Sequence, residues 1–177
     1  DGEYEFASML IERFTCYHRR SYVCKTGVGD VLIGAAASIA DYNGVPNVSH
    51  IKDKLVEMTH LNESIYGTGI ASSYQSQKMK SGVWQNDEML ANVCKHNVTR
   101  FPYQIGRFAQ DIAGGLMVTL PSEAEFRSPE TGPLLKKYLK GRKGVDVENK
   151  MRVLRLIENM TMGRNAVGYL TESMHGA

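Results

Sequence analysis

The sequence is short of several features that would place it in a specialised class of protein. Its 177 residues include only three cysteines, five prolines and one tryptophan. The cysteines, Cys16, Cys24 and Cys94, are too few for a disulfide-stapled scaffold, and a low, odd count is typical of a reducing compartment. We therefore expect a cytoplasmic protein whose thiols are either buried or used as ligands.

An excess of charge of one sign is also missing. Lys and Arg number 21 and Asp and Glu number 19, which gives a formal net charge of +2. This balance excludes disorder driven by charge, and it provides no overall excess of positive charge of the kind that nucleic-acid-binding proteins carry. No uninterrupted apolar run reaches the roughly 18 residues that a membrane helix needs, and residues 31–40 predict a buried helix instead. We expect neither a nucleic acid nor a membrane as partner.

What the sequence does contain is a helical period, with 42% hydrophobic residues to build a core. Apolar side chains recur at steps of three and four in five segments. These are a first segment with Phe6, Leu10, Phe14 and Tyr17 on one face, residues 28–42, residues 47–79, residues 86–113 and residues 146–160. Pro102 lies inside the fourth segment, whose apolar pattern continues beyond it, so one kinked helix is predicted there.

The connections between these segments are short. Residues 43–46 form a clear turn, residues 116–132 are predicted to be a loop, and residues 133–140 to be a short basic helix. Helices joined in this way form antiparallel bundles. The sequence therefore predicts an all-α fold, an antiparallel four-helix bundle with a short extra helix, in a single domain that spans residues 1–177.

The densest group of reactive side chains lies in residues 16–25, with two thiols, an imidazole, two phenols and three cations. His18 and Cys24 are of the types that ligate zinc or iron–sulfur centres. They supply only two ligands where four are usual. The alternative is a junction between helices with a core histidine and a buried cysteine, and the pattern alone favours that alternative.

Other motifs are open to two interpretations each. Residues 25–30 are rich in glycine and precede a helix, so they form a tight turn or a phosphate site at a helix N-terminus. Gly114 and Gly115 follow a long helix, as a C-cap does, or expose backbone to the pyrophosphate or adenosine of a nucleotide. The basic run at residues 136–143 is a solvated face or a contact for anions such as the phosphates of coenzyme A. Glu172, near the C-terminus, reads by itself as a surface carboxylate.

Longer motifs follow one another in a recognisable order. They include Tyr17-His-Arg-Arg-Ser-Tyr22, Ile33-Gly-Ala-Ala-Ala37, Asp111-Ile-Ala-Gly-Gly-Leu-Met-Val-Thr119 and Thr171-Glu-Ser-Met-His-Gly-Ala177. Over nearly its whole length the chain resembles the C-terminal part of the family of 4-hydroxybutyryl-CoA dehydratases, which are also vinylacetyl-CoA isomerases. The wider family includes the oxygenase component of 4-hydroxyphenylacetate 3-monooxygenase and has an acyl-CoA dehydrogenase-like fold. The resemblance is weakest in residues 72–86 and 127–148.

This resemblance implies that the chain is the C-terminal helical domain of a longer enzyme. The N-terminal helical and β-rich middle domains of the family have no counterpart in the sequence, and a chain that begins with Asp1 rather than Met fits this expectation. In the family the domain drives assembly of a homotetramer. The implied substrate is an acyl-CoA and the implied product is crotonyl-CoA, and we expect the isolated domain to be inactive.

The resemblance also implies cofactors, FAD and a 4Fe-4S cluster. His18 and Cys24 match two cluster ligands, and the other two are cysteines in the N-terminal part of the family chain. Tyr22 and Lys25 match residues near the cluster and the flavin, Tyr22 as a catalytic and Lys25 as a cofactor-binding residue. Glu172 matches a carboxylate with an acid/base role, and His18 is a candidate base. Gly114 and Gly115 match a glycine pair that approaches the adenosine half of a flavin from a neighbouring subunit.

One departure bears on the cluster. The family motif has one more residue between the histidine and the cysteine, with two glycines before the cysteine, where this sequence has Val23 alone. Removing one residue from a helix rotates the remainder of that helix by about 100°. Either a local bulge absorbs the rotation or the cluster is altered. The alternatives are therefore a flavin-dependent hydroxylase without a cluster, or a domain that serves oligomerisation only.

Overall fold

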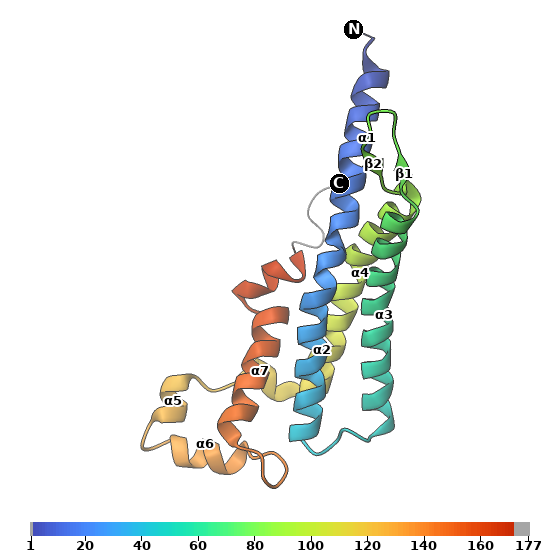
Figure 1. Ribbon diagram of the computed structural model, residues 1–177. Coiled ribbons are helices and arrows are strands. Elements are labelled where there is room, and N and C mark those ends of the chain that lie inside the picture. Colours follow the sequence, from blue (N-terminus) through green and yellow to red (C-terminus); the bar gives the residue numbers. More distant parts are fainter. Residues whose placement is uncertain (1, 172–177) are drawn as a thin grey trace.

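The structure, a computed structural model, describes residues 2–171, which form a bundle of four helical columns (Figure 1). The first column consists of helix α1 (Tyr4–Ser21), a 3₁₀ turn η1 (Tyr22–Cys24) and helix α2 (Lys25–Tyr42), which follow one another without a break. The others are α3 (Ser49–Tyr74), α4 (Glu88–Ala113) and α7 (Val147–Thr161). Successive columns run in opposite directions, which confirms the predicted all-α antiparallel four-helix bundle.

Shorter elements connect the columns. Strands β1 (Gln77–Lys78) and β2 (Trp84–Gln85) pair antiparallel between α3 and α4. The 3₁₀ turn η2 (Gly115–Thr119), α5 (Glu123–Arg127) and α6 (Gly132–Tyr138) lie between α4 and α7, and η3 (Arg164–Gly168) follows α7. The basic helix predicted at residues 133–140 is α6, whereas the loop predicted at residues 116–132 contains both η2 and α5.

The third predicted helix begins where expected, but its end was predicted too late in the sequence. It ends at Tyr74 rather than near residue 79, because the next residues form the two-stranded hairpin. Gly82 has a φ of +88°, a conformation that favours glycine, and its N–H donates to the carbonyl oxygen of Met79. The hairpin is too short to show the alternating pattern by which strands are found in a sequence.

The core lies between α2, α3, α4 and α7. Its fully buried side chains include Leu32, Ile39, Met58, Ile105, Leu154 and Ile157. The buried alanines of α2 let the neighbouring helices approach closely, and the buried helix predicted at residues 31–40 lies within α2. Helix α4 continues through Pro102 without interruption. A second, smaller apolar cluster, formed by Tyr22, Ile65, Cys94 and Val98, surrounds the 3₁₀ turn.

Helix α1 departs from the predicted pattern. Its apolar stripe was expected to mark a packed face, but Phe6, Leu10, Phe14 and Tyr17 are all exposed and Cys16 is buried instead. The N-terminal half of α1 extends beyond the ends of α3 and α4 (Figure 1), so among the described residues no helix covers the start of this stripe, at Phe6 and Leu10.

The continuous column from Tyr4 to Tyr42 meets the length and composition test for a membrane span, with a mean hydropathy of 1.4 over its most apolar window. A search for uninterrupted apolar runs does not find this column, because polar residues interrupt it. The finding is weak evidence for a membrane, because 44% of that window is buried inside the bundle and core helices pass the same test.

Candidate functional site

The candidate site lies where α1 meets α2. Residues 25–30, for which a tight turn was the simpler prediction, are instead the first turns of α2. That prediction was wrong because Ser21, Cys24 and Lys25 all keep right-handed helical backbone angles, so the chain passes through the junction without reversing. Gly29 allows close packing against α3, whereas a Cβ on Gly27 would meet no atom within 4 Å.

The 3₁₀ turn bears directly on the shortened spacing between His18 and Cys24. A 3₁₀ helix rises about 2.0 Å and turns about 120° per residue, against about 1.5 Å and 100° for an α-helix. The three residues of η1 therefore recover about the rise of one α-helical residue and about 60° of its rotation. The turn therefore offsets most of the missing residue, and a half cluster site formed by His18 and Cys24 stays a prediction.

The cysteines differ in accessibility. Cys24 is exposed, whereas Cys16 and Cys94 are buried. Burial raises the pKa of both buried thiols, which disfavours the thiolate needed for ligation. Among residues 2–171, no group of three or more His, Cys, Asp or Glu side chains could hold a metal ion. His18 and Cys24 would therefore need further ligands from another segment, as a half-site does.

His18 and Tyr22 are brought together one helical turn apart. Their rings meet edge to face, with centroids 5.1 Å apart and an interplanar angle of 86°, and Phe14 stacks on His18 at 6.3 Å. Tyr22 is 7% exposed, although it carries a phenol. Lys95 of α4 places Nζ 3.5 Å from the centre of the Tyr22 ring. The phenol is thus held by a cation and an imidazole from two different helices.

Lys95 belongs to this junction, although sequence reasoning did not single it out. It is only 6% exposed, and burial lowers its pKa, with further lowering by the positive charges of Lys25 and Arg19. In the sequence it looks like an ordinary polar residue beside the apolar stripe of its helix. Its position directly after Cys94 was the available signal, because a neighbour of a stripe residue can also face the core.

Lys25, the predicted cofactor-binding residue, is also buried, at 6% exposed. Its Nζ donates a hydrogen bond of 2.8 Å to the carbonyl oxygen of Gly168 in η3. Tyr169, the next residue, is 2% exposed, and burial raises the pKa of its phenol, with a smaller contribution from Asp30. The start of α2 therefore holds the segment that leads to Glu172, which itself lies outside the described residues.

Helix α3 secures the other side of the junction. Asn62 is 2% exposed and donates from Nδ2 to the carbonyl oxygen of Thr26 at 3.0 Å and to Oδ1 of Asp30 at 2.8 Å. This approach requires Gly29, because a Cβ there would collide with Oδ1 of Asn62. At a second close approach, a Cβ on Gly69 would lie 2.7 Å from Cγ2 of Val23. The backbone around the shortened turn is thus tightly fixed.

Gly114 and Gly115 lie at the end of α4, on a different part of the bundle. Gly114 has a φ of +77°, and its N–H donates to the carbonyl oxygen of Gln110, so the C-cap interpretation is confirmed. A Cβ at either glycine would meet no atom within 4 Å. The pair lines an open groove of about 380 Å³ together with Arg107, Gln110 and Met117, a size found among ligand sites. The open backbone also fits the approach of a flat ligand.

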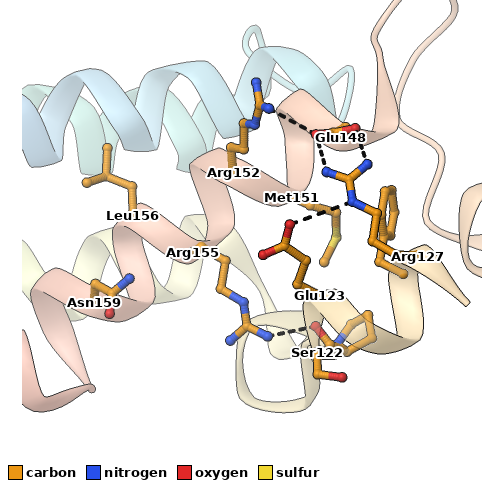
Figure 2. A pocket seen from close by; sticks show the side chains of 11 residues that line it. Ser122, Glu123, Arg127, Glu148, Met151, Arg152, Arg155, Leu156 and Asn159 are labelled. Carbon is orange, nitrogen blue, oxygen red and sulfur yellow. Dashed lines mark hydrogen bonds and ion pairs between the residues drawn. The ribbon is translucent and has the colours of Figure 1, made fainter.

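A further cavity, of about 520 Å³, lies between α5 and α7. Figure 2 shows Arg127 and Arg152 both directed at Glu148, with Nη2 of each within 3 Å of Oε1 (2.6 and 2.9 Å). Hydrogen bonds from Arg127, and the charges of both arginines, lower the pKa of Glu148. Sequence reasoning did not single out this network. None of the junction residues described above lines this cavity. The ion pair between Arg127 and Glu148 joins α5 to α7.

The basic run at residues 136–143 is exposed at Lys136, Lys137, Lys140, Arg142 and Lys143, as a solvated face would be. Arg142 is paired with Asp41 at 2.8 Å. A contact with the phosphates of coenzyme A stays a prediction.

Comparisons with known proteins agree on the family to which the chain is similar. Residues 7–177 match the family described as 4-hydroxyphenylacetate 3-hydroxylase C terminal (HpaB). The chain is 57% identical, over 184 aligned residues, to the 4-hydroxybutyryl-CoA dehydratase/vinylacetyl-CoA-Δ-isomerase of Clostridium aminobutyricum. That match covers 99% of this chain and 38% of the relative. The oxygenase component of 4-hydroxyphenylacetate 3-monooxygenase from Thermus thermophilus is 24% identical, over 78% of this chain and 28% of its own length.

Solved structures agree with these matches. The oxygen-tolerant archaeal 4-hydroxybutyryl-CoA dehydratase from N. maritimus superposes with a TM-score of 0.94 at 84% identity, over 99% of this chain and 35% of that one. HpaB, solved with FAD and 4-hydroxyphenylacetate, has a TM-score of 0.79 at 22% identity, over 88% of this chain and 33% of its own, which shows a shared fold. The chain thus spans little more than a third of the length of the dehydratases it matches.

Proposed function

Because the chain belongs to the 4-hydroxyphenylacetate 3-hydroxylase C-terminal family, we propose that it is the helical C-terminal part of a 4-hydroxybutyryl-CoA dehydratase/vinylacetyl-CoA isomerase. Within the family, identity of 57% and 84% to two dehydratases, against 28% and 24% to two monooxygenases, favours this member. The complete enzyme is a lyase with isomerase activity that converts an acyl-CoA substrate to crotonyl-CoA.

The observation that carries the proposal is the junction between α1 and α2. An imidazole, a buried phenol and a buried ammonium gather there, and the exposed thiol of Cys24 follows directly. Buried polar and charged groups are costly to fold around, so such a gathering is typical of functional sites. His18 and Cys24 would hold a 4Fe-4S cluster jointly with two cysteines from the rest of the enzyme.

When bound, FAD and the cluster would supply one-electron redox chemistry and a Lewis acid for the departing hydroxyl group. The residues of this chain orient the acyl-CoA and exchange its protons. Imidazole exchanges protons near neutral pH, so His18 is the candidate base. Tyr22 places its ring against the imidazole and is buried within the second apolar cluster. Glu172, which lies outside the described residues, would take part in the same acid/base work.

The groove at Gly114 and Gly115 is proposed to receive the adenosine half of FAD from a neighbouring subunit. Two features support this, the absence of a Cβ at both positions and the open space above them. HpaB, which shares the fold, was solved with FAD. The proposal therefore includes a homotetramer, located in the cytoplasm, and an isolated helical domain that is inactive because its site is shared between subunits and segments.

The test is analysis of the purified full-length enzyme. We expect iron and acid-labile sulfide in stoichiometry with four irons per subunit, bound FAD, and formation of crotonyl-CoA from 4-hydroxybutyryl-CoA. Enzyme with flavin but without iron, which hydroxylates a phenol with oxygen, would replace the proposal by the hydroxylase alternative. Tight flavin binding with turnover by the 177-residue chain alone would contradict its proposed inactivity.

A further inference from the structure

Lys95 is buried at a position where an apolar residue would be expected to contribute more to the stability of the fold. It projects from α4 into the second apolar cluster, next to Cys94 and Val98, and is 6% exposed. Burying an ammonium group is costly unless the surroundings compensate. The described compensation includes the face of the Tyr22 ring, 3.5 Å from Nζ, at the short end of the range for cation–π contacts.

This contact fixes the ring of Tyr22, which the ring of His18 also contacts. The rings of Tyr22 and His18 lie almost perpendicular, at 86°, and Tyr22 cannot tilt without losing either the imidazole or the ammonium. Lys95 and Tyr22 come from different columns, so the contact also sets the distance between α4 and the junction. Burial, and to a smaller extent the positive charges of Lys25 and Arg19, lower the pKa of Lys95.

We propose that Lys95 is a positioning residue, whose ammonium group holds the Tyr22 phenol edge-on to His18 for the chemistry of the site. The proposal rests on the proposed function for the reaction that is served, but the geometry it predicts can be measured separately. Lys95 acts through Tyr22 and is not assigned a contact with substrate. A positive charge on the ring face is the property required, so arginine can replace lysine and an apolar chain of similar length cannot.

The experiment compares three variants of the full-length enzyme. Lys95→Met keeps the length of the side chain and removes its charge, Lys95→Arg keeps the charge, and Lys150→Met is the matched control. Lys150, on α7, is likewise buried at 7% exposed with a pKa lowered by burial, but it donates to the carbonyl oxygen of Lys140 and has no part in the junction. Variants are checked for iron and flavin content, so that loss of a cofactor is not mistaken for loss of positioning.

We expect Lys95→Met to lower kcat at least tenfold with less than a threefold change in KM, Lys95→Arg to recover most of the loss, and Lys150→Met to leave kcat unchanged. In crystal structures, the Tyr22 ring should leave its perpendicular contact with His18 in Lys95→Met and keep it in the other two. An unmoved ring with unchanged kcat in Lys95→Met would overturn the proposal, and so would an equal loss in Lys95→Arg. If the wild-type enzyme does not dehydrate its substrate, the proposed function fails, and the ring position alone decides the role of Lys95.

Discussion

The Nζ atom of Lys25 lies 2.8 Å from the carbonyl oxygen of Gly168, across 143 positions of sequence. This hydrogen bond joins the first turn of α2 to η3, the last element before the C-terminal residues. Lys25 follows Tyr22 by three residues, so the bond ties the junction to η3 and gives a lysine expected to serve a cofactor an additional structural task. Hydrogen bonds to charged groups contribute about 1.5–3 kcal/mol when partly shielded from water.

Replacing Lys25 by methionine should therefore loosen η3 more than it destabilises the bundle. We expect amide hydrogen exchange in residues 164–171 to accelerate at least threefold in the full-length Lys25→Met enzyme, because the segment loses its anchor to α2. Mass spectrometry of the exchanged peptides measures the effect, and Lys52→Met, at an exposed position of α3, is the control. Equal exchange of this segment in the Lys25→Met and wild-type enzymes would show that other contacts hold it.

The cluster assignment predicts a loss of iron. His18→Ala and Cys24→Ala in the full-length enzyme should each bleach the visible absorbance of the cluster and lower the iron content, since each removes one of four ligands. Cys16→Ala is the matched control, because that thiol is buried beside the carbonyl oxygen of Asn86 and cannot reach the same site. Wild-type iron content in both ligand variants would refute the assignment.

The glycine groove predicts a separable effect on flavin. Gly115→Ala introduces a methyl group into the groove without backbone strain, whereas Gly114→Ala adds a strained positive φ that costs about 1–3 kcal/mol. Both variants should bind FAD more weakly, and Gly114→Ala alone should also unfold at lower temperature. Fluorescence titration of flavin into apoenzyme and thermal unfolding measure the two effects. Unaltered flavin affinity in Gly115→Ala would place the adenosine half elsewhere.

The raised pKa of Tyr169 predicts a loss of stability in alkali. Below pH 10.0, the reference value for tyrosine, the phenol is protonated in both the folded and the unfolded chain. Above it the unfolded chain releases the proton while burial keeps it on the folded protein, so stability falls as the pH rises, by about 1.4 kcal/mol per pH unit. Tyr169→Phe should flatten this slope between pH 10 and 11 in urea unfolding, and exposed Tyr138→Phe should not. Equal slopes in all three proteins would contradict the assignment.

The sequence predicted the bundle because the α4 and α7 stripes are regular and their apolar residues can only be buried against other helices. It failed at α1, whose stripe through Phe6 and Phe14 looks equally regular but is exposed among the described residues. Periodicity shows which residues share a face and does not show what covers that face. The remaining contacts needed coordinates, because Lys95 and Tyr22 are far apart in the sequence and nothing local links them.

The resemblance placed His18, Tyr22, Cys24 and Lys25 in one site, and the structure brings His18 against Tyr22 and buries Lys25 nearby. Residue spacing alone could not predict the 3₁₀ turn. Val23 stands where the resemblance implies two glycines, and a β-branched residue in that place becomes understandable only from the notch that Gly69 leaves for it on α3. Packing between helices thus decided the local backbone.

That notch yields the most direct stability test. A Cβ at Gly69 would lie 2.7 Å from Cγ2 and 2.8 Å from Cβ of Val23, and a stiff β-branched side chain cannot move aside. Gly69→Ala should therefore lower the free energy of unfolding by about 1–3 kcal/mol, as overpacking does. Gly67, two positions away on α3, has no atom within 4 Å of its Cβ position, so Gly67→Ala should raise stability by up to about 1 kcal/mol through helix propensity. Urea unfolding of the two variants measures both effects, and effects of the same sign would show that Val23 does not depend on the notch.

Because Val23 lies directly before Cys24, Gly69→Ala should also lower the iron content of the full-length enzyme, while Gly67→Ala leaves it unchanged.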